Sequence, residues 1–195
     1  MIYTDKYVLI APMKCASISV ESYLRESLGW NLHPFLGHSP YIPENLKDRE
    51  VIMLIRNPYV RLISSWQYSS TIVPKFVANP PDFKDFILEY VKLRAKFEHF
   101  NFHAYVPLEA KHFASNVRYS FKTLKEYKSI CNPKNLIRVE SLKQDFKNIG
   151  IEVDLPVLNN SSENSEKLLN LYTPEILNQC HFLKEDALEF DYDVL

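Results

Sequence analysis

Short, wholly apolar runs alternate along this chain with stretches in which apolar residues recur at helical spacing. The runs from Tyr7 to Ala11 and from Val51 to Ile55 have the length and composition of strands that are buried on both faces. The segment from Asn135 to Val139 predicts a third strand. Because predicted strands alternate with predicted helices, the pattern favours an α/β fold with a central, mainly parallel sheet flanked by helices.

Helices are predicted after each of the first two strands, the second of them beginning at Pro58. The apolar face of the first helix comprises Val20, Tyr23, Leu24 and Leu28. A later helix has its apolar face at Phe83, Phe86, Ile87, Tyr90 and Val91. The proline-rich segments Asn31 to Asn45 and Thr71 to Asp82 are predicted loops.

Two further helices are predicted in the last third of the chain. One follows the third strand from Glu140 and is closed by Gly150. The other opens at Thr173 and Pro174, a capping residue followed by a first-turn proline. Its predicted core-facing residues are Ile176, Leu177, Cys180, Leu183, Ala187 and Leu188.

Composition narrows the class of protein. A chain of 195 residues with 46% hydrophobic residues is the size of one domain with a sizeable core, so we predict a single domain over residues 1–195. A net charge of -1 gives no general attraction to nucleic acid or to an anionic membrane. No apolar run reaches the roughly 18 residues of a membrane span. The three cysteines lack the spacing of a disulfide framework or a zinc site, which favours a soluble, cytoplasmic protein without a metal.

The first strand-to-helix junction, "PMKCASIS", has the composition of a phosphate cradle. Lys14 lies in the turn, and Ser17 and Ser19 follow as hydroxyl donors at the start of the helix. The small residues Cys15 and Ala16 allow a phosphate to approach the backbone. The GxxxxGK[ST] spacing of a nucleoside triphosphate P-loop is absent, so the motif alone predicts only an anion site.

The second junction, "RNPYVRLISSW", places Arg56 at the end of a strand and Ser64 or Ser65 along the next helix. The guanidinium fork matches a terminal phosphate, and a serine hydroxyl can complete such a site. Arg61 lies five positions into the helix and points away from the strand end, which favours a structural role. Two anion sites in one sheet predict a ligand with two separate phosphates.

These two segments resemble the 5'-phosphosulfate-binding loop and the 3'-phosphate-binding motif of sulfotransferases that use 3'-phosphoadenosine 5'-phosphosulfate (PAPS). The later segments "LIRVESLKQDF", "LPVLNNSS" and "YTPEI" are similar to the carbohydrate branch of that family. The resemblance implies a three-layer, P-loop-like fold, PAPS as sulfuryl donor and no metal. It also implies that Arg56 and Ser64 bind the 3'-phosphate and that Lys14 assists the leaving oxygen. The implied phosphosulfate-binding residues are Lys14, Cys15, Ala16, Ser17, Ile18 and Ser19.

The acceptor hydroxyl loses its proton as it attacks sulfur, so a base must lie near the sulfuryl group. In some carbohydrate sulfotransferases a catalytic histidine follows a glycine in the loop ahead of the arginine strand, and "LGHSP" places His38 in a similar position. His103, in "NFHAYVP", is the second candidate because a similar histidine segment occurs in this branch. Glu21 is the third, since some sulfotransferases use a glutamate base.

The resemblance thus predicts sulfuryl transfer to a hydroxyl-bearing acceptor, a glycan by similarity to the carbohydrate branch, with no nucleic-acid partner. Two alternatives remain open at the level of sequence. One is a nucleotide or small-molecule kinase, against which the absence of GK[ST] and of an acidic magnesium ligand after "VIMLI" counts. The other is a nucleotide-binding module without catalytic activity. The sequence makes no prediction of the oligomeric state.

Overall fold

The computed structural model of the chain describes residues 1–34, 36–72, 79–98, 122–155 and 167–195. The chain divides into two compact units. The first unit comprises Met1–Arg56 and Phe102–Leu158, and the second comprises Asn57–Asn101 and Asn159–Leu195. A single domain over residues 1–195 stays a prediction.

The first unit is built on a five-stranded sheet with the order β3-β1-β2-β4-β5. Its strands are β1 (Ile2–Tyr3), β2 (Tyr7–Ile10), β3 (Asn31–Leu32), β4 (Glu50–Ile55) and β5 (Asn135–Arg138). β2, β4 and β5 are parallel, with Ile10 opposite Met53 and Ile55 opposite Arg138. The α/β class and the three apolar strands are therefore confirmed, with ends within one residue of those predicted.

The prediction of a mainly parallel sheet is wrong for the part of the sheet that contains β1 and β3. β1 runs antiparallel to both β2 and β3, so the sheet is mixed and parallel only in part. For β1 and β2 the cause is local: a tight turn joins the two strands, and in it the Thr4 N–H donates to the Tyr7 carbonyl at 2.9 Å. A connection this short can join only antiparallel strands.

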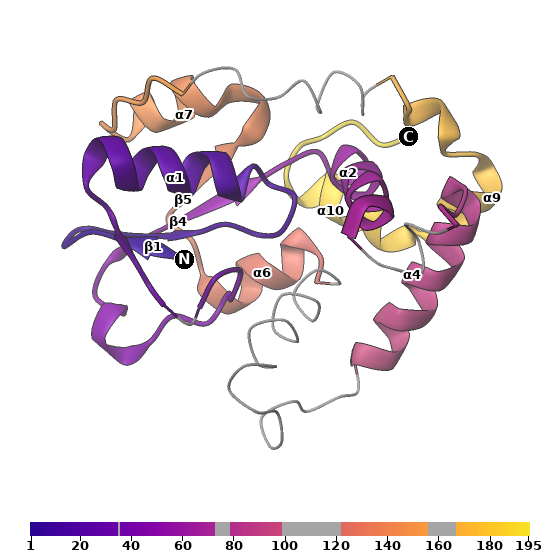
Figure 1. Cartoon of the computed structure of the whole chain (residues 1–195), viewed down its shortest axis with the longest axis horizontal. Helices are drawn as coiled ribbons and strands as arrows, with labels where there is room; N and C mark the ends of the chain where they lie inside the picture. Colours follow the sequence, from indigo (N-terminus) through magenta and orange to yellow (C-terminus); the bar gives the residue numbers. More distant parts are fainter. Residues whose placement is uncertain (35, 73–78, 99–121, 156–166) are drawn as a thin grey trace. The chain divides into compact units, whose positions relative to one another are not determined.

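Helices flank this sheet on both sides. Figure 1 shows α1 (Ser17–Leu28) and α7 (Leu142–Asn148) on one side and α6 (Leu124–Cys131) on the other. Short 3-10 turns lie at Glu44–Leu46 and Val139–Ser141. The predicted apolar face of the first helix is only partly right. Val20 and Leu24 are buried, whereas Leu28 is exposed just before Gly29 ends the helix with φ 68°.

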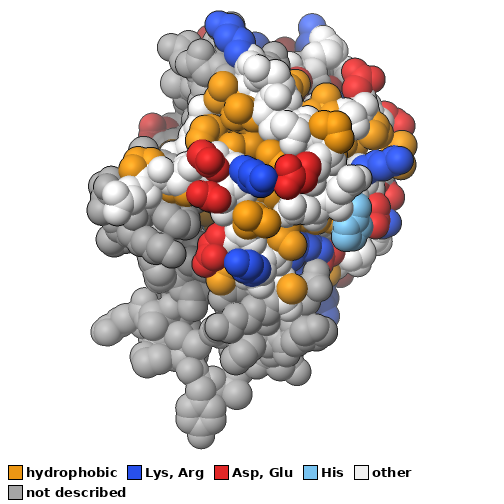
Figure 2. All heavy atoms as spheres, turned by 90° about the vertical axis from the view of Figure 1, so that its right-hand side faces the viewer, with side chains coloured by type: hydrophobic (Ala, Val, Ile, Leu, Met, Phe, Trp, Pro, Cys, Tyr) orange, Lys and Arg blue, Asp and Glu red, His pale blue; other side chains and the backbone are white. Residues whose placement is uncertain are grey.

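All regular secondary structure in the described part of the second unit is helical: α2 (Pro58–Ile72), α4 (Phe83–Glu98), α9 (Pro174–Gln179), α10 (His181–Glu189) and a 3-10 turn at Leu169–Leu171. Aromatic rings pack against one another in its core. The ring of Tyr172 packs edge-on against Tyr59 and Phe83, and its hydroxyl donates to the Tyr59 carbonyl at 2.9 Å. The face drawn in Figure 2 carries basic and acidic side chains interspersed among apolar ones.

The predicted last helix is two helices. Thr173 caps α9 and Pro174 occupies its first turn, as predicted, but the helix ends at Gln179 and α10 begins at His181. Cys180 between them has φ −113° and ψ 37°, which is outside the helical range. Ile176, Cys180, Leu183 and Ala187 are buried as predicted, whereas Leu188 is 62% exposed.

Candidate functional site

The turn between β2 and α1 carries the lysine of the first basic motif. Lys14 and Ala16 both have positive φ, 66° and 54°, although neither is glycine. A non-glycine residue in this conformation is strained by roughly 1–2 kcal/mol, and such strain clusters at functional sites. The turn is held by the Cys15 N–H, which donates to the Pro12 carbonyl at 3.1 Å. The chain therefore adopts a glycine-like turn here without any glycine.

This turn presents backbone donors at the start of α1. The first intrahelical bond runs from the Val20 N–H to the Ala16 carbonyl at 3.0 Å, and Ala16 provides no side-chain cap. The amides of Ser17, Ile18 and Ser19 lie ahead of that bond, at the end of the helix where the dipole favours negative charge. A twelve-residue helix that begins in this way has the arrangement of an anion-binding site.

Arg56 joins Lys14 at this turn. It follows β4, is 4% exposed, and its Nη1 donates to the Lys14 carbonyl at 3.1 Å. Burial, and then the positive charge of Arg56, lower the pKa of the Lys14 ammonium. Two cations brought together in a partly desolvated place repel each other, and a bound anion would relieve that repulsion.

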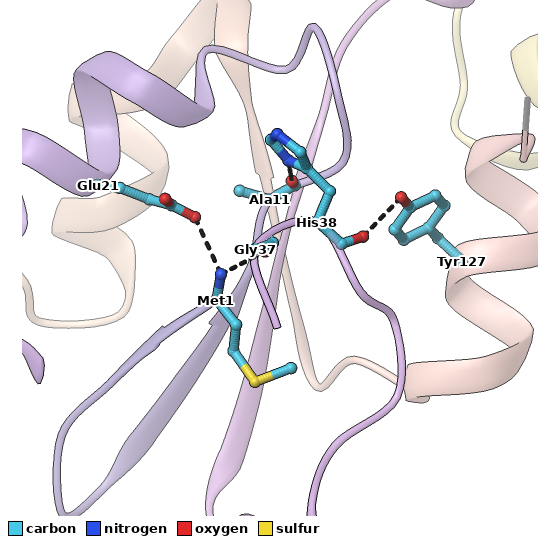
Figure 3. A network of polar contacts seen from close by, with 6 residues as sticks. All are labelled: Met1, Ala11, Glu21, Gly37, His38 and Tyr127. Atoms are coloured by element: carbon cyan, nitrogen blue, oxygen red, sulfur yellow. Dashed lines mark hydrogen bonds and ion pairs between the residues drawn. The ribbon is translucent and has the colours of Figure 1, made fainter. Parts of the chain in front are cut away.

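His38 lies in the loop after β3, and its ring contacts the residue that leads into this turn. Its Nδ1 is 2.7 Å from the carbonyl oxygen of Ala11, the residue that follows β2 (Figure 3). A carbonyl oxygen can only accept, so Nδ1 carries the proton and Nε2 is the basic nitrogen of the neutral ring. This is the protonation pattern that a general base requires.

Tyr127 holds the backbone of His38 from the opposite side. Its hydroxyl donates to the His38 carbonyl at 2.7 Å, and the tyrosine side chain is fully buried on α6. Figure 3 shows Glu21 and Tyr127 reaching from α1 and α6 toward the segment that holds Gly37 and His38. Both the ring and the backbone of His38 are thus fixed by hydrogen bonds.

Glu21, the third candidate base, has another contact. Its Oε1 lies 3.3 Å from the amino group of Met1, which also donates to the Gly37 carbonyl. Burial lowers the pKa of this amino group, and the charge of Glu21 partly offsets the effect. Glu21 therefore pairs with the amino group that holds the Gly37 carbonyl, next to His38 in the chain.

Ser64 and Arg61 lie on α2 in the second unit, and both are buried. Burial raises the pKa of the Tyr90 hydroxyl to about 12, and the charges of Arg61 and Arg94 act to lower it. A buried guanidinium beside Tyr90 fits the interpretation of Arg61 as a structural residue. Ser65 donates from its hydroxyl to the Arg61 carbonyl at 3.1 Å.

The structure thus brings together Lys14, its turn, Arg56 and His38 in the first unit. His103 lies outside the described residues, and Ser64 belongs to the other unit. Sequence reasoning missed the Ala11 carbonyl and Tyr127. Tyr127 is 89 positions from His38, and its pattern on an amphipathic helix is that of any core residue.

Among the described residues, no group of histidine, cysteine and carboxylate side chains is placed to hold a metal ion. A search of the same residues also finds no helix with the length and apolar character needed to cross a membrane. No family model, curated protein or solved structure matches this chain.

Proposed function

We propose that this protein is a sulfotransferase that moves the sulfuryl group of PAPS to a hydroxyl acceptor. One observation carries the proposal: the turn that holds Lys14, and that accepts a hydrogen bond from Arg56, follows Ala11, whose carbonyl fixes His38 as the Nδ1–H tautomer. An anion site and a basic imidazole nitrogen at one turn are what sulfuryl transfer to a hydroxyl needs. In this proposal the first unit has a P-loop-like arrangement of strand, turn and helix.

The donor's 5'-phosphosulfate would lie on the amides of Ser17 to Ser19. As the sulfur–oxygen bond to the phosphate breaks, negative charge grows on the bridging oxygen. The Lys14 ammonium and the positive end of α1 stabilise that charge without any proton transfer. The pKa of Lys14 is lowered in the ligand-free protein, and the incoming anion favours its charged form.

His38 would act on the acceptor. The hydroxyl oxygen forms the new bond to sulfur, its proton passes to Nε2 of His38, and 3'-phosphoadenosine 5'-phosphate (PAP) leaves with the electrons of the broken bond. The imidazolium then returns the proton to water. The Ala11 carbonyl stabilises the Nδ1–H throughout, because Nδ1 donates in both charge states.

The 3'-phosphate and the acceptor are proposed on the resemblance to the carbohydrate branch. Arg56 and Ser64 would bind the 3'-phosphate, and a glycan would provide the hydroxyl. The contact of Arg56 Nη1 with the Lys14 carbonyl gives the arginine a further part, since it braces the turn that binds the other phosphate. His103 stays the second candidate for the base.

Binding of PAP and PAPS, followed by isothermal titration calorimetry, tests the donor site. Lys14→Ala and Arg56→Ala are each expected to weaken binding at least about tenfold, as for loss of one charge-assisted contact. Lys147→Ala is the matched control, because this lysine is exposed on α7. Micromolar binding that the two site variants leave unchanged would overturn the donor site.

Transfer is measured with labelled PAPS and a panel of glycan and other hydroxyl acceptors. His38→Ala is expected to abolish transfer and to leave PAP affinity unchanged, because the imidazole acts only on the acceptor. Magnesium-dependent turnover of ATP would support the kinase alternative instead. PAPS binding without transfer to any acceptor would support the binding module.

A further inference from the structure

Two of the hydrogen bonds that hold His38 act on different parts of the residue. The Ala11 carbonyl accepts from the ring, whereas the Tyr127 hydroxyl donates to the backbone carbonyl, both at 2.7 Å (Figure 3). His38 lies in a loop without regular secondary structure, and the Met1 amino group holds the carbonyl of the preceding Gly37. The tyrosine hydroxyl restrains the His38 carbonyl itself, and it does so from a helix.

The helix that carries Tyr127 is firmly anchored. Its N-terminus has a complete capping box: the Thr123 hydroxyl accepts from the Glu126 N–H, and the Glu126 carboxylate accepts from the Thr123 N–H. Toward its other end, the Cys131 thiol lies 4.0 Å from the sulfur of Met53 in β4. Tyr127 itself has no exposed surface. A hydroxyl on such a helix holds its acceptor in a fixed position.

We propose that Tyr127 is a positioning residue for His38. By holding the His38 carbonyl, its hydroxyl keeps the ring in line with the Ala11 carbonyl, so that Nε2 remains the basic nitrogen. Without that hydrogen bond the loop relaxes, the Nδ1–H···O bond weakens, and the ring distributes its proton over both nitrogens. The tautomer of His38 can be measured whatever reaction the protein carries out. Its role in catalysis rests on the proposed sulfotransferase function.

The first test needs no activity. Nitrogen chemical shifts of the imidazole, assigned to His38 by comparison with His38→Ala, report which ring nitrogen carries the proton. In the parent protein we expect the Nδ1–H tautomer, and in Tyr127→Phe a mixture of the two with a downward shift of the His38 pKa. The downward sign follows because a bond to a carbonyl favours the imidazolium over the neutral ring.

The matched control is Tyr7→Phe. The Tyr7 hydroxyl also donates to a backbone carbonyl in the first unit, that of Ile149 at 3.4 Å, which lies outside the loop of His38. Circular dichroism and PAP affinity verify that each variant is folded. We expect Tyr7→Phe to leave the His38 tautomer and the pH profile of transfer unchanged.

Transfer kinetics form the second test. Tyr127→Phe is expected to lower kcat on the order of tenfold, part of what a general base contributes, with the KM for PAPS unchanged. The acid limb of the pH profile should move down together with the His38 pKa. If Tyr127→Phe lowers activity only by destabilising the fold, the acid limb of the pH profile stays at the same pH.

The outcomes separate the two proposals. If Tyr127→Phe changes the tautomer but the parent never transfers sulfate, the positioning holds and the proposed function fails. If the parent transfers sulfate and Tyr127→Phe matches it in tautomer and kcat, the positioning is overturned. A parent spectrum that shows His38 protonated on Nε2 overturns the positioning without any variant, because it contradicts the bond to the Ala11 carbonyl.

Discussion

Single residues determine the shape of the turn between β2 and α1. Ala16 has φ 54° and ψ 23°, a conformation that glycine adopts without a steric penalty. Lys14 on the other side of Cys15 has φ 66°. An ordinary structural turn would place glycine or asparagine at such positions. The strain of placing a lysine at this positive φ is best explained if its ammonium contacts an anion.

Ala16→Gly tests this strain directly. Glycine removes about 1–2 kcal/mol of left-handed strain and adds up to about 1 kcal/mol of unfolded-state entropy, so we expect unchanged or higher stability. Ala95→Gly, an exposed site within α4, should instead lose about 1 kcal/mol. Urea unfolding measures both. Equal losses at the two positions would contradict the positive φ of Ala16.

The lowered pKa of Lys14 predicts proton uptake when an anion binds. Burial and Arg56 disfavour the ammonium in the free protein, whereas a phosphate beside it favours the charged form. Between the lowered pKa and the raised pKa of the complex, the complex holds more protons than the free protein. If the anion is PAP, as proposed, we expect its affinity to fall as pH rises through that window.

Calorimetry at about pH 9, in two buffers of different ionisation enthalpy, counts the protons taken up. Lys14→Arg is the control. Its guanidinium stays protonated at that pH in the free protein and in the complex, so no proton is taken up at this position. An affinity for PAP that stays constant across alkaline pH in the parent would show that Lys14 does not face the anion.

At the scale of elements, the apolar strands could be predicted from the sequence and the short ones could not. β2 and β4 are nearly continuous apolar runs because their residues are buried on both sides. β1 and β3 have two residues each, too few for any periodicity, and their pairing depends on the turn after Tyr3 and on the antiparallel register. The mixed character of the sheet arises from these two strands.

Helix boundaries, like strands, could be predicted only where the sequence carries a local signal. Pro58 and the Thr173–Pro174 pair mark helix starts through their own backbone chemistry, and α2 and α9 begin at the two prolines. The break at Cys180 has no such marker, because the apolar spacing continues across it. At the break Cys180 is 1% exposed, and its N–H and carbonyl bond to Leu177 and Leu183.

At the scale of the whole molecule, the candidate site was predictable as a set of motifs but not as a geometry. The basic turn, the arginine after β4 and the histidine after glycine each have a local signal. Their convergence depends on the parallel pairing of β2 with β4 and on a bond from Tyr127 across 89 positions. Contacts of this kind are properties of the fold, and no local pattern encodes them.

Ligand binding should therefore stabilise the first unit around this turn. A ligand that binds only the folded state at 100 times its Kd adds about 2.7 kcal/mol to the free energy of unfolding. With PAP in that excess, amide hydrogen exchange should slow most in peptides covering residues 11–20 and the end of β4, where the turn and Arg56 lie. Lys14→Ala should lose the effect, whereas Lys147→Ala should keep it. Two results would contradict a PAP site at this turn. One is that ATP, at equal occupancy, slows amide exchange in the same peptides. The other is that PAP leaves exchange in residues 11–20 unchanged.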